Sequence, residues 1–586
     1  MSLPFHSSPP RAARLARRAA LAVVSTAALL LGALPAAAQG GAAGGALPSL
    51  GEAGEMTPLA ERKLGDAIAR ELYRDPDYID DPVIGEYVDG VWRALLAGAR
   101  TRGELPPELD ERFAWQVFLG RDRSINAFAL PGGYFGLNLG LVGVVRTRDE
   151  LASVLGHEMS HVTQRHIARL LGQQSRQTPL LIAAMVAGAI AASKNPQAGA
   201  ALAVGGQAAI AQQQLNFSRD MEREADRVGY AVMSQAGFAP QGFVSMFQKL
   251  QTAARVDDNG DWPYLRSHPL TTQRIADMQQ RVQALHLPPE GTDWETVLVA
   301  ARARVLSRPG VDVLRAWAGE PAQPDFARQP LAQRAGALYA AALARAELRE
   351  LPPAQALAER LAPLMAEHPR ALRQVHLLQA ELALRADQAP RALAILANVP
   401  TTASVLARRD QAVSAPAGGS AAGAAAERGG QPEPPPGRPK AASAPSGGSA
   451  AGAAAERGGS STSQAGRAVL MLRTQALLRT GQAGEAASQL RTWVADHAHD
   501  SGAWQALAQA DAAQGQMLRS LRAEGEVALA QLDYAGAVNR WRAAQDYSRQ
   551  HPGDSAALIE ASIVDARMRE AQALLQQQRL EEQKNR

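Results

Sequence analysis

Apolar residues recur at intervals of three and four along most of the chain, a spacing typical of amphipathic helices. One such stretch follows Thr147-Arg148-Asp149-Glu150, which has the Thr-x-x-Glu form of a capping box. Its apolar positions are Leu151, Val154, Leu155, Val162, Ile167, Leu170 and Leu171. We therefore predict one helix from about residue 148 to residue 171.

Shorter apolar runs precede this helix and favour strands. Phe113 to Phe118 reads as a short strand, and the runs 124–130 and 134–138 flank Pro131-Gly132-Gly133, which predicts a hairpin. A strand edge beside the helix would hold an extended peptide by strand addition, or it is an internal edge without a ligand. The substrate-binding candidates are Asn126, Ala127, Phe128, Gly132 and Gly133.

The second half of the chain changes to short Ala- and Leu-rich helices, at 331–350, 353–367 and 370–386. Farther on, Gly481 and Gly515 are 34 residues apart, as are Leu470 and Trp504. A 34-residue period with Gly between paired helices is the signature of tetratricopeptide repeats, which build a concave surface for partners. We predict such repeats at 331–405 and 466–586.

Two segments are low in complexity. Residues 414–430 recur almost verbatim as 443–459, and a Gly-, Ala-, Ser- and Pro-rich stretch of this kind buries no core, so 406–465 is predicted to be a disordered insertion. Residues 178–214 are rich in Ala and Gly, with 180–192 almost wholly apolar. That apolar run is too short to cross a bilayer. It is either a core helix hairpin, or an exposed flap or membrane-touching element over the active site.

The N-terminus has the form of a secretory signal peptide. Arg11, Arg14, Arg17 and Arg18 precede an apolar stretch at 19–34, and Ala36-Ala37-Ala38 predicts cleavage after Ala38. Those four arginines account for the whole formal charge of +4, so the remaining chain gives no reason to expect a nucleic-acid partner. The chain has no cysteine, so any metal ligands must be His and carboxylate. We expect a periplasmic protein, with peripheral membrane contact left open.

The predicted helix carries candidate chemistry. His157-Glu158-Met159-Ser160-His161 is a His-Glu-x-x-His sequence, and positions i and i+4 share one helix face. His157 and His161 can therefore bind one Zn²⁺, while Glu158 takes a proton from a water molecule.

A second helix, from about Met221, supplies two more acids on one face, Glu222 and Asp226. Glu222 is the expected third metal ligand, and Asp226 lies one turn on, within reach of a ligand imidazole or of the reacting group. Glu224 should face away from the site.

Three further histidines lie near these helices. His268, in Ser267-His268-Pro269, would orient substrate, stabilise an oxyanion, or take the open metal position and hold an enzyme inactive; a structural role is the alternative. His166 should rotate off the ligand face, and His286 should end a helix that Thr271 or Thr272 caps. We treat His166 and His286 as structural.

Together, the 157–161 motif, the run 222–229, the segment 124–133 and Ser267-His268-Pro269 resemble the periplasmic zinc metallopeptidases with tetratricopeptide repeats. These are relatives of the heat-shock and prenyl-protein membrane metallopeptidases. The resemblance covers roughly 58–285. It implies one Zn²⁺ per chain on His157, His161 and Glu222, Glu158 as catalytic acid and base, Asp226 as a second catalytic acid, and His268 on a regulatory loop near the metal.

We therefore predict a mainly α (α+β) protein: a zincin-type metallopeptidase domain with a small β-sheet, then an α-solenoid. The predicted parts are a signal peptide (1–38), a flexible lead-in (39–56), the peptidase domain (57–300), a Pro-punctuated linker (301–330), the repeats and the insertion. The family's role implies cleavage of unfolded or misassembled outer-membrane β-barrel proteins, and contact with the machinery that assembles them. The alternative is a chaperone or scaffold that grips such clients through its repeats, with an auto-inhibited peptidase site.

Overall fold

The computed structural model describes residues 56–173, 218–256, 263–285, 291–400, 466–551 and 555–584. All of them lie in a single compact unit that starts at Gly54. The predicted signal peptide, the lead-in up to residue 55, the apolar run 180–192, His286 and the duplicated insertion lie outside the described residues. Among the described residues, no helix combines the length and the apolar content that a membrane span requires.

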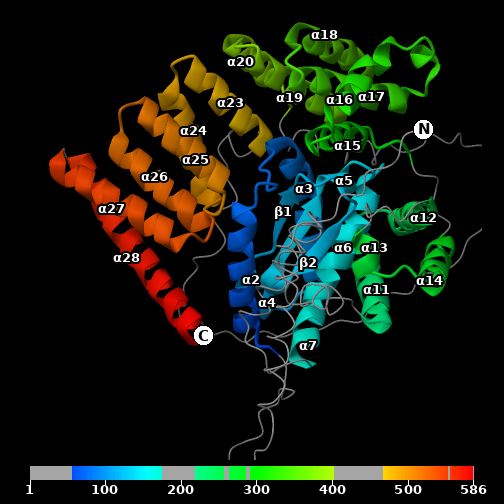
Figure 1. Ribbon diagram of the computed structural model, residues 1–586, viewed down its shortest axis with the longest axis horizontal. Coiled ribbons are helices and arrows are strands. Elements are labelled where there is room, and N and C mark those ends of the chain that lie inside the picture. The colour runs from blue at the N-terminus through cyan, green and yellow to red at the C-terminus, as the bar shows by residue number, and fades with distance from the viewer. Residues whose placement is uncertain are drawn as a thin grey trace, which may run out of the picture. The chain divides into compact units, whose positions relative to one another are not determined.

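A three-stranded sheet lies beside the motif helix (Figure 1), with the strand order β1-β3-β2. The strands are β1 (Gln116–Gly120), β2 (Ala127–Leu130) and β3 (Tyr134–Asn138). β2 and β3 pair antiparallel around the 3-10 turn η1 (Pro131–Gly133), so the hairpin is confirmed. The strand expected at 113–118 starts later, because Trp115 has a positive φ of 50° and its indole N–H donates to the carbonyl of Leu109.

The motif helix is α6 (Arg148–Thr163), and the predicted cap is present: the Thr147 hydroxyl accepts from the backbone N–H of Glu150. The expected continuation to residue 171 is wrong, because the helix breaks and α7 (His166–Gln173) starts in a new direction. Arg165 adopts a left-handed φ of 55° at the break. Its guanidinium bonds the Glu61 carboxylate in α2 (Pro58–Arg74) and the carbonyl of Met56, so tertiary contacts hold the turn.

Helices α11 (Arg219–Gln235) and α12 (Gln241–Val256) pack on α6. Gly156 and Gly229 meet where α6 and α11 cross: a Cβ on Gly229 would lie 2.9 Å from the backbone of Gly156. Two glycines at the crossing therefore bring the acid-bearing face of α11 directly onto the motif helix. α13 (Pro263–Ser267) and α14 (Thr272–Gln283), which Thr271 caps, complete the surroundings.

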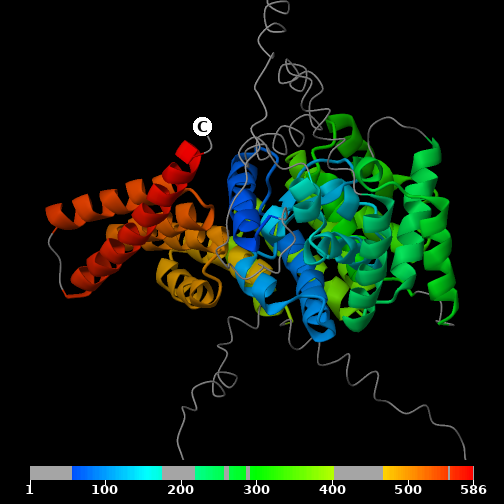
Figure 2. The ribbon, with the colours of Figure 1, turned by 90° about the horizontal axis from the view of Figure 1, so that it is seen from below.

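The remaining helices of the first half are α3, α4 and α5. The second half consists of helices from α15 onward, which Figures 1 and 2 show in green to red. Their bounds are α3 (Pro82–Arg102), α4 (Pro107–Arg112), α5 (Leu139–Val142), α15 (Trp294–Leu306), α16 (Val311–Gly319), α17 (Leu331–Glu347), α18 (Leu351–Leu361), α19 (Pro369–Arg385), α20 (Ala389–Ala397), α23 (Arg467–Arg479), α24 (Ala483–Asp496), α25 (Ser501–Ala513), α26 (Met517–Ala530), α27 (Tyr534–Gln550) and α28 (Ser555–Lys584), with short 3-10 turns η3 (Glu320–Ala322), η4 (Phe326–Arg328) and η5 (Ala362–Met365).

Successive helices from α23 to α28 pack against one another, and the two glycines of the 34-residue period lie between paired helices. Gly481 and Gly515 have left-handed φ values of 74° and 72°, which a residue without Cβ adopts without strain. The mainly α class with a small sheet, followed by a helical region, is confirmed. The tetratricopeptide assignment and the domain boundaries stay predictions.

The segment 301–330, expected to be a Pro-punctuated linker, is largely helical. It contains the second half of α15, helix α16 and two 3-10 turns. α15 is buried on several sides, with Leu298 packed in one apolar cluster and Val299 in another. The prolines and polar residues that suggested a linker occupy short turns between these helices.

Candidate metal centre

Four side chains from three segments converge in one buried cluster. His157 and His161 come from α6, Glu222 comes from α11, and His268 comes from the loop between α13 and α14. One possible ligand atom of each lies within 4.8 Å of the others, and all four residues are buried. The structure thus brings together the three residues expected to bind metal and the loop histidine.

The spacing of these atoms fits a small divalent cation. The Nε2 atoms of His157 and His161 are 3.0 Å apart, and each is 3.4 Å from a carboxylate oxygen of Glu222. Ligands at the usual zinc–nitrogen distance of about 2.0–2.1 Å in a tetrahedral site are separated by about 3.3 Å. Three imidazoles and a carboxylate whose possible ligand atoms lie within 4.8 Å of one another are a donor set that zinc uses, so the residues present fit the metal that the sequence implies.

The pKa values of the residues in this cluster are shifted in different directions. Burial lowers the pKa of His157, but Glu222 and Asp226 outweigh burial and raise that pKa to about 9. Burial also opposes ionisation of Glu222, yet His268 and His157 hold its pKa well below the ordinary value. Burial keeps the pKa of His161 well below its usual range. A carboxylate anion beside imidazole nitrogens is the donor set that His- and carboxylate-ligated metals use.

Glu158 lies next to the cluster and is buried with neither carboxylate oxygen in a hydrogen bond. Its Oε1 is 3.5 Å from His268 Nε2, and burial raises the pKa of its carboxyl group. A raised pKa brings a carboxylate closer to the range in which it both accepts and returns a proton near neutral pH. The backbone of Ala129, in the edge strand β2, also acts on this carboxyl group, so the strand and the acid lie on the same side of the cluster.

Asp226 is bound by two side chains, those of His157 and Arg274. Its Oδ1 lies 3.0 Å from His157 Nδ1, and Arg274 donates to both of its oxygens at 2.6 and 2.7 Å. Burial raises the pKa of Asp226, but Arg274 and His157 lower it below the ordinary value overall. An ionised carboxylate held in this way orients the His157 ring, whereas the second catalytic acid that the resemblance implied would have to release a proton.

Arg274 is a residue that the sequence did not single out. It comes from α14, is buried, and bonds Glu222 Oε2 at 2.7 Å in addition to Asp226 and the carbonyl of Pro269. It therefore fastens the loop that carries His268 to both acids of α11. A lone arginine in a polar helix resembles any solvated surface position, so no sequence signal identified it.

His268 lies inside the cluster. Its Nδ1 is 2.9 Å from Glu222 Oε1 and 3.4 Å from His157 Nε2, and its ring stacks on Tyr264 with centroids 4.8 Å apart. These distances make His268 a member of the group of side chains that could hold one metal ion. Of the open sequence alternatives, this geometry matches a fourth ligand.

Two residues that we expected to point away from the site are connected to the candidate ligand His161. His166 was expected to rotate off the ligand face, but the break after α6 turns it back, so its Nδ1 is 2.9 Å from His161 Nδ1. Its Nε2 is 3.0 Å from the carboxylate of Glu224, which we had expected to face away. Burial lowers the pKa of His166 to about 4, so this ring is neutral at physiological pH.

The candidate substrate residues separate into two groups. Ala127 and Phe128 lie in β2, whose outer edge faces no other strand among the described residues, and the carbonyl of Asn126 accepts from the N–H of Asn138. Gly132 and Gly133 are buried turn residues with φ values of 73° and 78°, packed on α2 and on the segment 113–115. The two glycines therefore shape the hairpin, and their role in substrate binding stays a prediction.

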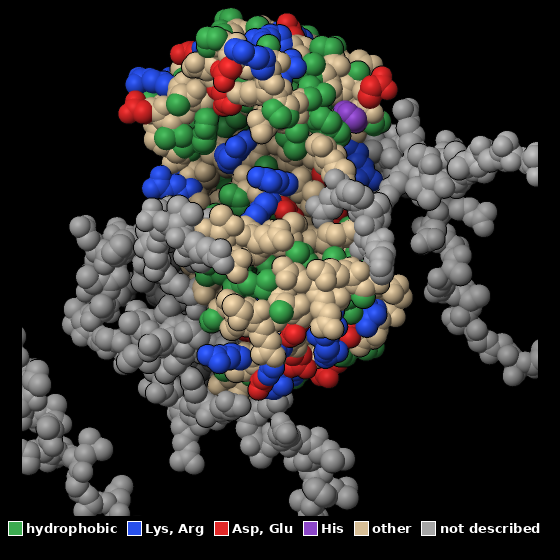
Figure 3. All heavy atoms as spheres, turned by 90° about the vertical axis from the view of Figure 1, so that its right-hand side faces the viewer, with side chains coloured by type: hydrophobic (Ala, Val, Ile, Leu, Met, Phe, Trp, Pro, Cys, Tyr) green, Lys and Arg blue, Asp and Glu red, His purple; other side chains and the backbone are tan. Residues whose placement is uncertain are grey.

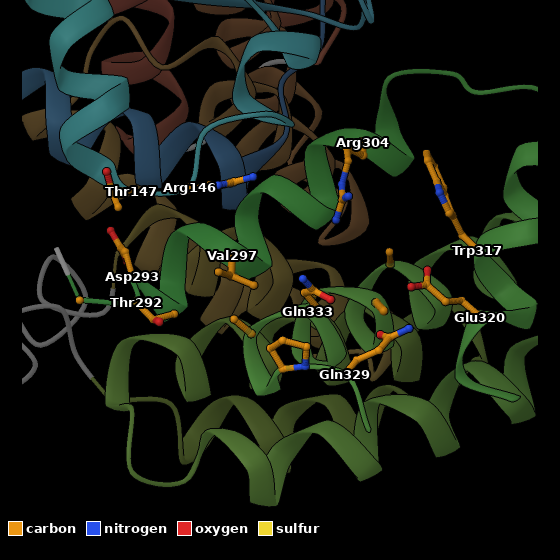
Figure 4. Close-up of a pocket in the computed structure, with 16 residues that line it drawn as sticks. Arg146, Thr147, Thr292, Asp293, Val297, Arg304, Trp317, Glu320, Gln329 and Gln333 are labelled. Atoms are coloured by element: carbon orange, nitrogen blue, oxygen red, sulfur yellow. The ribbon is translucent and has the colours of Figure 1, made fainter. Parts of the chain in front are cut away.

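A separate pocket of about 650 Å³ lies between α15, α17 and the residues just before α6 (Figure 4). Its lining includes Arg146, Arg304 and Trp317, and none of the four cluster residues. On the face of the molecule in Figure 3, Lys and Arg side chains gather where the surface is hollowed. The metal cluster does not open into this pocket.

Comparison with known proteins agrees with the geometry. Residues 102–282 match the model of peptidase family M48, and this range contains all four cluster residues and Glu158. The chain carries an M48 peptidase domain. A "Putative beta-barrel assembly-enhancing protease" of Vibrio cholerae is 35% identical over 55% of this chain and 64% of its own length.

Two further relatives extend the comparison. The "Beta-barrel assembly-enhancing protease" of Escherichia coli K12 is 30% identical over 55% of this chain and 63% of its own length. The "Metalloprotease LoiP" of the same organism is 28% identical over 170 residues, which are 29% of this chain and 63% of its own length. The chain thus spans just under two thirds of the length of the first curated relatives.

Proposed function

We propose that this protein is a zinc-dependent endopeptidase of the bacterial periplasm that degrades misassembled outer-membrane β-barrel proteins and assists the assembly of others. The observation that carries the enzymatic part is the convergence of His157, His161 and Glu222 from two helices, with the carboxylate of Glu158 buried beside them. The names of the relatives support the client class, and the Arg-led apolar leader supports export.

His157, His161 and Glu222 would hold one Zn²⁺. The chemistry that such a cation supplies when bound is Lewis-acid polarisation of the scissile carbonyl and a lowered pKa of a water molecule. Glu158 accepts the water proton as the water oxygen adds to the carbonyl carbon. Glu158 then passes this proton to the amide nitrogen as the C–N bond breaks, which releases an acid and an amine. Asp226, held by Arg274, keeps the His157 ring in place.

The edge of β2 would bind the peptide in an extended form, because its backbone groups face no other described strand and Ala129 lies beside Glu158. The helices after residue 331 would grip clients or the assembly machinery, as a tetratricopeptide-like surface does.

The substitution Glu158→Gln tests this function. It should retain stoichiometric zinc, because the ligands are untouched, and it should lose cleavage of an unfolded outer-membrane barrel protein by at least about a hundredfold. Glu111→Gln, an exposed acid, serves as the control and should cleave like the unaltered protein. A metal-loaded Glu158→Gln protein with full activity would refute the role of Glu158.

The position of His268 favours a second candidate function, a chaperone or scaffold whose peptidase site is held inactive. Its Nδ1 lies 2.9 Å from Glu222 and 3.4 Å from His157, so His268 would take the open metal position and hold the site inactive. Casein cleavage by the unaltered protein and by His268→Ala separates the alternatives. Activity that appears only in the variant indicates an auto-inhibited enzyme, whereas metal binding without activity in either protein favours the scaffold.

A further inference from the structure

The second ring nitrogen of His161 faces another imidazole. His161 Nδ1 lies 2.9 Å from His166 Nδ1, with the two ring planes at 74°. His166 Nε2 lies in turn 3.0 Å from Glu224 Oε2, and Arg169 bonds the same oxygen at 3.0 Å. These contacts form a chain from the candidate ligand through a buried histidine to a carboxylate at the surface.

Only one assignment of protons satisfies the whole chain when Nε2 of His161 faces a cation. That Nε2 must be unprotonated, so the ring proton of His161 is on Nδ1 and is donated to His166. His166 Nδ1 then accepts, and its own proton lies on Nε2, where it is donated to Glu224. Each ring is neutral, and each nitrogen has one defined role.

We propose that His166 and Glu224 are positioning residues for the candidate metal site, which fix the tautomer and the ring orientation of His161. This inference rests on the proposed function. A metal-bound histidine is usually oriented by a hydrogen bond from its other nitrogen, and loss of such a partner weakens metal binding.

The two motif histidines are then held in equivalent ways. His157 Nδ1 meets Asp226 directly at 3.0 Å, whereas His161 Nδ1 reaches Glu224 through His166. Helix α11 supplies both terminal carboxylates as well as the ligand Glu222, at alternate positions of one short run. A continuous helix would have carried His166 away from His161; the left-handed Arg165 turns it back.

Zinc affinity tests the proposal directly. In a competition titration with a chromophoric chelator, His166→Phe should weaken Zn²⁺ binding by about 10–100-fold. His166→Asn, whose side-chain oxygen can accept near the position of Nδ1, should recover part of the loss. His499→Phe, at an exposed histidine, is the matched control and should bind Zn²⁺ like the unaltered protein.

Glu224→Gln provides a second test that does not depend on a buried position, because the Glu224 side chain is 33% exposed. It should weaken Zn²⁺ binding less than His166→Phe does, and it should add nothing when combined with His166→Phe, since both act through one chain. Asp220→Asn, an exposed acid on the same helix, is the control. The visible spectrum of the Co²⁺-substituted protein should change in His166→Phe and stay unchanged in Asp220→Asn.

The outcomes also separate this proposal from the function on which it rests. If the unaltered protein binds Zn²⁺ and cleaves, but His166→Phe and Glu224→Gln bind Zn²⁺ as tightly, the positioning role is overturned and the peptidase function stands. If the unaltered protein binds no Zn²⁺, both fail together. Additive losses in the double variant would overturn the single chain of contacts.

Discussion

At the scale of single residues, the site depends on a charge that is not itself a candidate ligand. Arg274 forms ion pairs with both Asp226 and Glu222, two carboxylates buried about one helical turn from each other. A buried carboxylate without a partner is costly, so one arginine determines whether both acids are tolerated in this interior.

Arg274→Met should therefore lower the free energy of unfolding by about 3–5 kcal/mol, because it keeps the volume of the side chain and removes its charge. Urea denaturation followed by circular dichroism measures the change. Arg281→Met, on the exposed face of the same helix, should change stability by less than about 1 kcal/mol. Equal effects of the two substitutions would contradict the role of Arg274.

The sequence identified the residues whose spacing encodes their role and missed those that tertiary structure recruits. His157 and His161 at i and i+4, and Glu222 and Asp226 with the same spacing, could be recognised because helical geometry alone puts each pair on one face. Arg274 and Tyr264 come from the separate helices α14 and α13, and His166 follows a helix break. Nothing in local periodicity reports such contacts.

At the scale of elements, the geometry of the site is set by how closely α11 approaches α6. Gly229 faces Gly156 at the crossing, and a Cβ added to Gly229 would lie 3.0 Å from the backbone nitrogen of His157. Helix backbones resist such displacement, so the whole of α11 would have to move outward, and Glu222 with it.

Gly229→Ala should thus destabilise the protein by about 1–3 kcal/mol and should weaken zinc binding as well. Thermal denaturation and chelator competition give the two measurements. Gly90→Ala is the matched control: it lies in a helix with nothing within 4 Å of the added carbon, so alanine should stabilise by about 0.5–1 kcal/mol. A stabilised Gly229→Ala protein would show that the crossing has room to spare.

The helix break after α6 was the main element that the sequence did not predict. Neither residue at the break, Gln164 or Arg165, is a glycine or a proline, and the apolar spacing continues across them. The left-handed Arg165 is held by the buried Glu61 in α2, at 3.1 Å, more than a hundred residues earlier in the chain. The break thus depends on a contact that no local pattern contains.

This Glu61 should give the protein a measurable pH dependence. Burial raises the pKa of Glu61 to about 7, above its value of 4.5 without the fold, so the folded state binds its proton more tightly than the unfolded state does. The stability that this proton contributes is complete below about pH 4.5 and is lost as the pH rises to about 7, amounting to about 3 kcal/mol.

The side chain in Glu61→Gln cannot titrate. The free energy of unfolding of this variant, relative to that of the unaltered protein, should therefore rise by about 3 kcal/mol between pH 5 and pH 8. Urea denaturation of both proteins at the two pH values measures the difference. Glu71→Gln, at an exposed position of the same helix, should leave the pH dependence unchanged. Parallel stability curves for Glu61→Gln and the unaltered protein would rule out a raised Glu61 pKa.

At the scale of the whole described chain, a buried polar contact joins a helix that precedes the M48 match to two helices that follow it. Arg302 in α15 bonds both oxygens of Asp81, which caps α3, at 2.9 and 2.6 Å, and also bonds Glu381 in α19 at 2.6 Å. The expected linker would have left the two regions joined only by the chain. The structure instead places α15 against both α3 and α19, so they share one interior.

Arg302→Met should therefore destabilise the protein by about 3–5 kcal/mol, because it strands the carboxylates of Asp81 and Glu381 away from water. Arg308→Met is the matched control, since Arg308 also bonds an acid far away in sequence, Asp77, but in a pair that is 54% exposed on the arginine side. Exposed pairs contribute about 0–1 kcal/mol, so this substitution should have little effect. Denaturation monitored by tryptophan fluorescence compares the two. Equal small losses of stability in the two variants would mean that apolar packing alone holds the two regions together. A large loss of stability confined to Arg302→Met would establish that one buried guanidinium couples the stability of the region around α3 to that of the helices that follow.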